Sequence, residues 1–241
     1  TRVAGRGPRS VRDMSAREHT TYLSDVRILT GMVGRLFTEP EPFIQRQAAT
    51  GRLVAPTLIV LVVSLVMSLQ AAAVYYSLGP EVDEIINAVI LLGGYYFLEG
   101  IALWLVFSFA LYLLSVGAGG HPLLGHIVRI VGWGMLPFVG TALAWSAGRY
   151  YALKDVAPPD LTINSRIEHE TNAMGEYMGE ATGDPVLIAA MVVGGLFLVA
   201  SGYYWTVGLT RASDLSRRRA ALVAAIPLAA FFGWKFLSTA V

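Results

Sequence analysis

The chain has 241 residues, of which 55% are hydrophobic and 15% charged, and its formal net charge is +1. This composition is typical of a membrane protein. The absence of cysteine excludes disulfides, thiolate nucleophiles and cysteine metal sites. Of the basic residues, only Lys154 and Lys235 are lysines, a bias typical of particular genome compositions or of halophilic sources.

Residues 1–20 are rich in arginine, glycine and serine, which predicts a flexible basic arm. The arm lacks the interleaved aromatic residues of a nucleic-acid-binding module, so no nucleic-acid partner is expected. It also lacks the apolar core of a signal peptide, so we expect the first membrane span to act as the insertion signal.

Residues 21–37 predict an amphipathic helix. Its apolar residues recur at three- and four-residue spacing and share one face: Val26, Leu29, Met32, Val33, Leu36 and Phe37. The helix either lies on the cytoplasmic leaflet, with its arginines near lipid phosphates, or packs on the rest of the protein. Pro40 and Pro42 are expected to end it, so that segment 21–52 comprises this helix and a proline-rich approach to the membrane.

The remaining residues, 53–241, contain five apolar segments near or above the roughly 20 residues that a helix needs to cross a bilayer. These spans are expected at about 53–78, 91–116, 127–153, 186–209 and 220–241. None of them alternates polar and apolar residues, which favours helices over barrel strands. The sequence therefore predicts an all-α protein, a polytopic transmembrane bundle of five helices with an N-terminal amphipathic cytoplasmic helix.

Basic residues are concentrated in alternate loops of this arrangement. The segment before the first span and the fourth connection are rich in arginine, whereas the first hairpin, 79–87, and the outer loop, 154–185, are acidic. By the positive-inside rule, the N-terminus is cytoplasmic and the C-terminus lies outside the cell membrane. The arginines that border the spans on the cytoplasmic side form a predicted basic face for anionic lipids or for a partner's acidic surface. They are Arg35, Arg46, Arg52, Arg211, Arg217, Arg218 and Arg219.

The second span contains interruptions at Gly93, Gly94, Glu99 and Gly100. Two interpretations remain open: one long tilted helix, or a short interfacial helix followed by a span. Glu99 is the candidate intramembrane acid, and at membrane depth it would require a partner or a proton. A span that starts near Tyr95 would instead place Glu99 beside the outer headgroups.

Small residues and one proline mark the predicted helix-packing positions. Glycine permits close approach of helices in a membrane, and proline permits a kink. The positions are Gly119, Gly120, Gly132, Gly134, Pro137, Gly194 and Gly195.

Five residues of the outer loop have the side-chain types of a metal site but not the spacing of a known ligand motif. They are Glu168, His169, Glu170, Glu176 and Glu180. An acidic, solvated surface is the favoured interpretation, so neither a metal nor a cofactor is expected. His121 and His126, beside the second hairpin, allow a proton relay, but interfacial histidines more often reach toward water.

The order of several motifs resembles the Yip domain family, five-pass membrane proteins named for interacting with Ypt/Rab GTPases. The motifs are a proline–phenylalanine segment at 36–43, a Gly-Gly turn at 119–124, a small–aromatic–small–x–x–Pro stretch at 131–137, and the Gly-Leu pair 208–209 followed by 215–220 and Pro227. The resemblance covers about residues 36–240. It implies five spans, a cytoplasmic N-terminus and an outside C-terminus, and it does not imply catalysis.

Eukaryotic members are thought to recruit Rab GTPases. This chain departs from them in its short soluble arm and its long outer loop, and prokaryotic members have no Rab system, so we do not extend GTPase binding to it. The arginine bias suggests a prokaryotic member. We expect a non-enzymatic accessory or scaffold subunit, or a membrane-organising protein, that acts through lipids and through a protein partner or a homo-oligomer. The alternative is a small transporter or channel that uses Glu99 and the broken spans, since discontinuous helices often line substrate sites.

Overall fold

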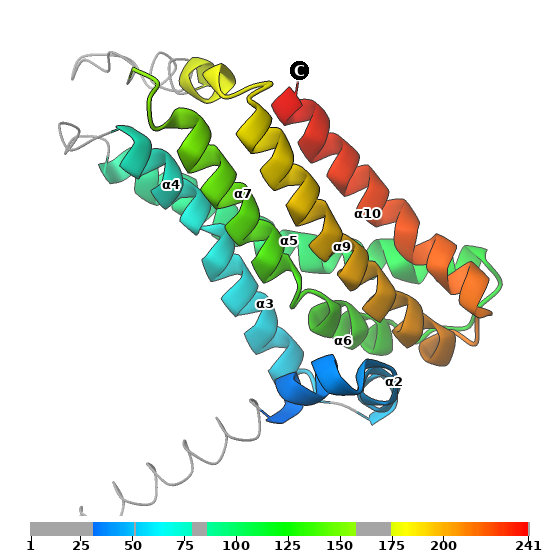
Figure 1. Ribbon diagram of the computed structural model, residues 1–241. Helices are drawn as coiled ribbons and strands as arrows, with labels where there is room; N and C mark the ends of the chain where they lie inside the picture. Colours follow the sequence, from blue (N-terminus) through cyan, green and yellow to red (C-terminus); the bar gives the residue numbers. More distant parts are fainter. Residues whose placement is uncertain (1–30, 51, 79–85, 158–174, 241) are drawn as a thin grey trace, which may run out of the picture. The chain divides into compact units, whose positions relative to one another are not determined.

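The computed structural model describes residues 31–50, 52–78, 86–157 and 175–240 (Figure 1). The chain divides into two units, residues 1–43 and 44–241, and each is described by itself. All regular elements in the described ranges are helices, which confirms the all-α prediction.

In the first unit, residues 31–38 are helical, and they form the last part of the predicted amphipathic helix. Residues 21–30 lie outside the described ranges. A new helix, α2 (Pro40–Thr50), begins almost at once. The sequence predicts instead that the prolines end a helix and that a proline-rich approach follows. Proline is tolerated in the first helical turn, because the N–H groups there have no partner inside the helix, and Pro40 and Pro42 both lie in that turn of α2.

In the second unit, four helical segments are long and apolar enough to cross a bilayer: Val54–Val74, Ile90–Gly117, Pro185–Ala212 and Arg217–Leu237. A fifth candidate is the pair Leu124–Gly134 and Phe138–Leu153, which is bent by 45°. Counting the bent pair as one span gives five, as the sequence predicts. The corresponding helices are α3 (Val54–Met67), α4 (Leu69–Leu78), α5 (Ile86–Gly117), α6 (Leu124–Gly134), α7 (Phe138–Leu153), α9 (Pro185–Ala212) and α10 (Arg217–Ala240).

Two of the spans contain breaks with local causes. Between α3 and α4, the Ser68 hydroxyl donates to the carbonyl oxygen of Leu65 at 2.6 Å, a local bond that competes with regular helix geometry. Between α6 and α7, Pro137 is the N-cap residue of α7. A backbone N–H at this position would have no partner inside α7, so the helix loses no hydrogen bond to the proline. The bend of the third span therefore coincides with Pro137.

The second span is a single helix, so the first of the two interpretations of this segment is the one observed. Helix α5 has 32 residues, about 48 Å at 1.5 Å per residue, which exceeds a hydrocarbon core of about 30 Å. Such a helix fits a bilayer when it is tilted or extends beyond it.

The spans of the second unit form a closed ring. Helix α5 contacts α3, α4 and α10; α7 contacts α3, α4 and α9; and α9 contacts α10. Figure 1 shows α4, α7, α9 and α10 side by side, with α5 crossing behind them. Helix α6 contacts α3, α5 and α9.

One aromatic ring from each of four helices meets in the core of this ring. Phe107 of α5 lies 5.0 Å from Trp205 of α9, 6.0 Å from Phe138 of α7 and 5.7 Å from Phe231 of α10, measured between ring centroids. These four side chains are buried. Aromatic pairs at such separations stabilise the core beyond the area that they bury.

Two tryptophans lie directly over glycines of a neighbouring helix. Trp205 covers Gly134 and donates from Nε1 to the carbonyl oxygen of Val131 at 3.3 Å. Trp145 covers Gly194 and donates to the carbonyl oxygen of Met191 at 3.5 Å. In both cases the acceptor lies three residues before the glycine.

A third pair is similar. Trp104 of α5 donates to the carbonyl oxygen of Val128 at 2.9 Å, four residues before Gly132. A side chain on a helix covers the turn that precedes its own Cα. A glycine therefore leaves the carbonyl groups of that turn accessible, which is why an indole N–H reaches the backbone at these places.

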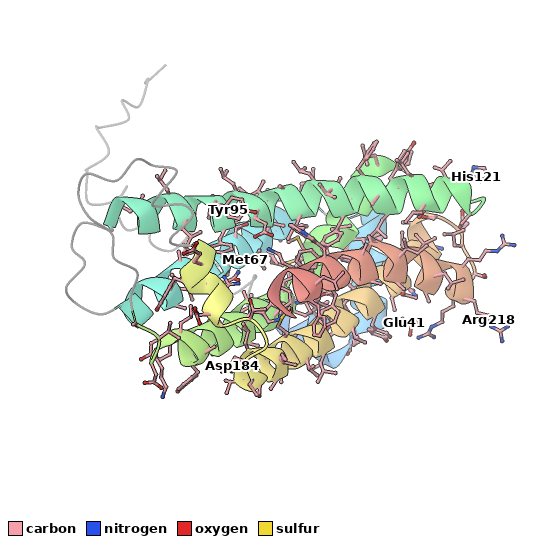
Figure 2. The ribbon with its side chains drawn as sticks, turned by 90° about the horizontal axis from the view of Figure 1, so that it is seen from above. Glu41, Met67, Tyr95, His121, Asp184 and Arg218 are labelled. Atoms are coloured by element: carbon pink, nitrogen blue, oxygen red, sulfur yellow. The ribbon has the colours of Figure 1, made fainter. Side chains whose placement is uncertain are left out.

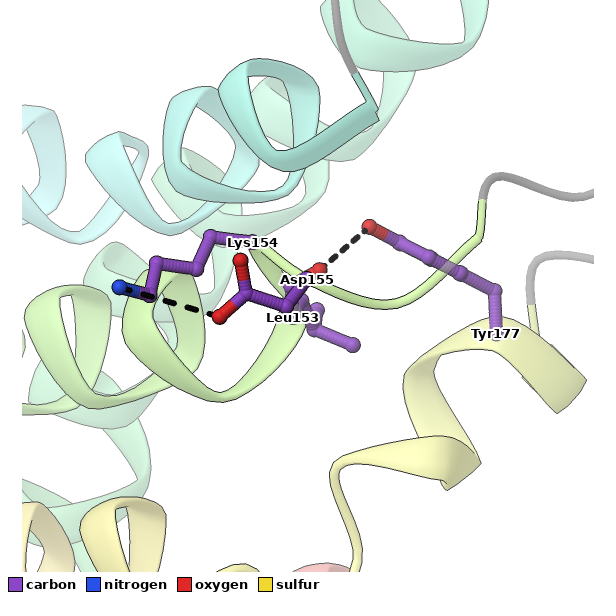
Figure 3. Close-up of polar contacts among 4 residues, drawn as sticks. All are labelled: Leu153, Lys154, Asp155 and Tyr177. Carbon is purple, nitrogen blue, oxygen red and sulfur yellow. Dashed lines mark hydrogen bonds and ion pairs between the residues drawn. The ribbon is translucent and has the colours of Figure 1, made fainter.

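The outer loop returns to the bundle through Tyr177, which lies in the helical segment 175–180. Its hydroxyl donates to the carbonyl oxygen of Leu153 at 3.3 Å (Figure 3). Tyr177 is buried in a small cluster with Val74, Ala181 and Leu187. Asp184 then caps α9 by accepting from the backbone N–H of Val186 at 2.7 Å.

We expect Gly134→Ala and Gly194→Ala each to lower the free energy of unfolding by about 1–3 kcal/mol, because the new methyl group overlaps an indole ring. Equilibrium unfolding in mixed detergent micelles measures the change. The control is Gly94→Ala in α5, where an added Cβ meets nothing within 4 Å, so stability should stay equal or rise slightly. Equal losses in all three variants would contradict the packing role.

Candidate functional site

The α5–α6 and α9–α10 connections lie together at one end of the second unit, which we call the basic end. The backbone N–H of His121 donates to the carbonyl oxygen of Ser213 at 3.3 Å, and Arg219 Nη1 donates to the carbonyl oxygen of Ala118 at 3.4 Å. Figure 2 shows His121 and Arg218 at this end and Asp184 at the other. The two connections that the topology assigns to one side of the membrane are thus in contact.

The Gly119–Gly120 turn allows this contact. Gly119 has a φ of +87°, a conformation that favours glycine. A Cβ on Gly120 would lie 2.6 Å from the carbonyl oxygen of Ser213, closer than van der Waals contact permits. Gly119 and Gly120, which the sequence predicts as helix-packing positions, thus lie in the turn, where they bring the two connections together.

The arginines of the predicted basic face are distributed as follows. In the second unit, Arg46, Arg52, Arg211, Arg217, Arg218 and Arg219 are exposed. The last four lie in or beside the α9–α10 connection at the basic end, and Arg52 precedes the start of α3. Arg35 belongs to the first unit, whose placement relative to the second is not described. Whether these side chains bind lipid or a partner stays a prediction.

Glu99 of α5 forms an ion pair with Lys235 of α10. Lys235 Nζ lies 2.5 Å from Glu99 Oε1, and the side chains are 17% and 8% exposed respectively. The contact is a close ion pair rather than an aligned hydrogen bond, since neither carboxylate oxygen has a hydrogen-bond donor with suitable geometry among the described residues. Lys235 Nζ also lies 4.8 Å from the ring centroid of Trp234, within the range of a cation–π contact.

The two charges lie at the same depth in the bundle. Glu99 is 18 residues before the end of α5 at Gly117, and Lys235 is 18 residues after the start of α10 at Arg217. Each distance is about 27 Å of helix, nearly the thickness of a hydrocarbon core. The pair therefore lies at one level of the two helices, about 27 Å along each helix from its end at the basic end.

A second polar contact lies toward the same end. Arg149 Nη1 of α7 donates to the hydroxyl of Tyr96 at 2.6 Å. Arg149 lies four residues before the end of α7 at Leu153, and Tyr96 lies three residues before Glu99. The end of the bundle opposite the basic end thus carries two contacts between charged or polar groups of different helices.

The ion pair borders an apolar groove of about 870 Å³ between α5 and α10. This volume falls within the range of about 300–1,000 Å³ that is typical of small-molecule sites. Among the lining residues that the structure describes, Glu99 is the one charged side chain. The groove and the ion pair together form the candidate site.

Three of the acidic-loop residues weighed as metal ligands, Glu168, His169 and Glu170, lie outside the described residues. Within the described ranges, no group of three or more histidine, aspartate or glutamate side chains is arranged to hold a metal ion. The remaining members, Glu176 and Glu180, are exposed. His121 and His126 lie on either side of the start of α6.

Sequence reasoning identified Glu99 but missed its partner Lys235 and the contact of Arg149 with Tyr96. The sequence does contain one signal for Lys235 as the partner of Glu99. Once the topology is fixed, α5 and α10 run in opposite directions, and equal distances from their basic ends place Glu99 and Lys235 at one level. The neighbouring position of α5 and α10 in the ring, however, follows only from the structure.

We expect Lys235→Met to lower the free energy of unfolding by roughly 3–5 kcal/mol, because it leaves a buried carboxylate without its cation. The double variant Glu99→Gln/Lys235→Met should recover most of this loss. Unfolding in mixed micelles provides the measurement. The matched control is Lys154→Met, whose pair with Asp155 is 3.8 Å long and largely exposed (Figure 3), so its effect should be small. A double variant as unstable as the single variant would refute the pairing.

A family model described as the Yip1 domain matches residues 34–236. The match covers most of the chain, including all the candidate spans except the last residue of α10's span. Comparisons with curated proteins and with solved structures gave no match. With its apolar helices and this match, the chain belongs to the Yip1 domain family of multi-pass membrane proteins.

Proposed function

We propose that this protein is a non-enzymatic accessory or scaffold protein that organises a membrane through its basic face. The observation that carries the proposal is the exposed cluster Arg217, Arg218 and Arg219 at the first turn of α10, beside Arg211. Cationic residues next to a membrane span are attracted to anionic headgroups, each with about 1 kcal/mol. An acidic surface of a protein partner or of a second copy offers the same attraction.

The position of this cluster limits how it can act. Cations at the N-terminus of a helix do not gain from the helix dipole, which favours anions there. In the second unit, Arg219 makes a hydrogen bond to Ala118, while the side chains of Arg217 and Arg218 are exposed. The cluster is therefore better explained by an anionic contact outside the bundle than by stabilisation of α10.

The proposed orientation has the N-terminus in the cytoplasm and the C-terminus outside the cell membrane. Its support is the contact between the α5–α6 and α9–α10 connections, which puts the arginines of 211–219 on one side. Acidic side chains lie at the other end, among them Asp155, Glu176 and Asp184. A prokaryotic source stays a prediction.

A small transporter or channel is the second candidate function. The groove beside Glu99 favours it, because substrate sites of transporters lie where helices separate. One observation weighs against it: Glu99 is already neutralised by Lys235. The transporter would be favoured if the unchanged protein carries ions into proteoliposomes and the Glu99→Gln variant does not.

We expect Arg217→Gln/Arg218→Gln/Arg219→Gln to weaken association with phosphatidylglycerol by up to about two orders of magnitude, from about 1 kcal/mol for each arginine. Electron paramagnetic resonance with spin-labelled lipids compares phosphatidylglycerol with phosphatidylcholine in reconstituted membranes. Added salt should reduce the difference in the unchanged protein. The control is Lys154→Gln at the opposite end. A phosphatidylglycerol preference that survives the triple substitution would show that these three arginines do not contact the lipid. A protein partner would then be their remaining candidate contact.

The chain contains no cysteine, so single cysteines report the orientation directly. We expect Glu180→Cys to react with a membrane-impermeant maleimide in intact cells, and Ser216→Cys to react only after permeabilisation. Both residues are exposed. The reverse pattern would overturn the proposed orientation, and equal labelling of both would show that the two ends do not face opposite sides.

A further inference from the structure

The carboxylate of Glu99 is enclosed by the protein in the conformation that the structure shows. Both of its oxygen atoms are buried, and Lys235 Nζ lies against Oε1 in the ion pair described above. The side chain of Lys235 is itself only 17% exposed. Access to this carboxylate from outside the protein therefore requires a movement of the side chains or helices that surround it.

The glycines of the spans show where such a movement is easiest. At most of them, an added Cβ would lie 3.0 Å or less from an atom of a neighbouring helix. At Gly94 of α5 and Gly233 of α10 it would meet nothing within 4 Å, and neither residue has a positive φ. Neither close packing nor a left-handed backbone therefore accounts for glycine at these two positions. What remains is conformational freedom, since glycine weakens a helix relative to alanine.

These two glycines lie in the two helices that carry the ion pair. Gly94 is five residues before Glu99, and Gly233 is two residues before Lys235. Each helix thus has a weak point close to its charged residue. The weak point in α10 separates Lys235 from the part of the helix that runs back to the basic end.

The two sides of Gly233 are held differently. Phe231, before the glycine, is buried in the aromatic core. After the glycine, Trp234 and Leu237 are more than half exposed, and Lys235 is the residue that pairs with α5. The aromatic core therefore fixes α10 as far as the glycine, whereas the ion pair holds the following segment, residues 234–240, against α5.

The same segment contributes to the wall of the groove between α5 and α10. Trp234 lines the groove together with Tyr95 and Glu99 of α5. An outward movement of residues 234–240 would widen the groove beside Glu99 and would also withdraw Lys235 from the carboxylate. Charges separated in this way need new polar partners, so opening is coupled to the entry of water or of a polar group.

We propose that residues 234–240 form a lid over Glu99, hinged at Gly233 and held shut by the Glu99–Lys235 ion pair. The structure shows the closed state. In the open state the carboxylate is accessible from the end of the groove. This device goes beyond the proposed role of the basic face, which lies at the other end of α10.

Pulsed electron paramagnetic resonance in nanodiscs measures the movement, because the chain contains no cysteine and accepts spin labels at chosen positions. Leu105→Cys on α5 is combined with Leu237→Cys beyond the hinge or, as the matched control, with Leu222→Cys before it. All three leucines are more than half exposed, and none of them lines the groove. We expect a second, longer distance for the first pair of labels and a single distance for the control pair.

The population of the longer distance should follow the latch and the hinge. The double variant Glu99→Gln/Lys235→Met, which leaves no unpaired buried charge, should raise it severalfold. Gly233→Ala should lower it severalfold, because alanine favours the helix and its Cβ has room. A single distance for the first pair in both the unchanged protein and the double variant would overturn the lid, and so would equal changes in the two pairs of labels.

A hydrophobic carbodiimide, dicyclohexylcarbodiimide, tests access to Glu99 directly, and mass spectrometry quantifies the adduct. We expect slow modification of Glu99 in the unchanged protein and a severalfold slower reaction in Gly233→Ala. The control is Gly125→Ala at the start of α6, where an added Cβ also meets nothing within 4 Å, and the rate should stay the same. An unmodified Glu99, or equal effects of the two alanines, would overturn the lid. The triple arginine variant should leave the rate unchanged, so the lid and the basic face fail separately.

Discussion

Contact between tryptophan and glycine determines how the helices of this bundle approach one another. Lipid chains are as apolar as leucine, so helices in a bilayer associate through close packing and polar contacts rather than through the hydrophobic effect. Trp205 over Gly134 and Trp145 over Gly194 provide both, because each indole fits where a Cβ is missing and donates to a carbonyl oxygen of the preceding turn. Thr141 adds a hydrogen bond to the carbonyl oxygen of Gly194 at 3.0 Å. These contacts join α6 and α7 to α9.

The opposite side of the ring is joined differently. Between α5 and α10 the structure shows an aromatic contact at Phe107 and Phe231, an ion pair at Glu99 and Lys235, and an apolar groove alongside them. No glycine lines this groove among the described residues, and α5 and α10 share a less extensive contact than α7 and α9. The helices that pack through glycine lie on one side of the bundle, and the candidate site lies on the other.

The sequence predicted the helical class and the five spans, and it identified Glu99 as a candidate intramembrane acid, because apolar length and the cost of a buried charge are local properties. It also identified Gly134 and Gly194 as helix-packing positions, since small residues in a span predict close approach of neighbouring helices. It did not predict which tryptophans cover them, because this depends on which helices are neighbours. For the same reason it missed Lys235 as the partner of Glu99, and it missed the groove, which exists only between two assembled helices. The break at Ser68 depends on the direction of one hydroxyl, which composition does not reveal.

The Glu99–Lys235 pair also has a consequence for biosynthesis. Ribosomes deliver α5 well before α10, so Glu99 reaches the membrane while its cation has not yet been synthesised. An unpaired acid within a membrane span is costly unless it contacts water, a headgroup or a partner. When α10 arrives, Lys235 neutralises the acid and α10 closes the ring between α5 and α9. The later helix therefore completes the electrostatic balance of the earlier one.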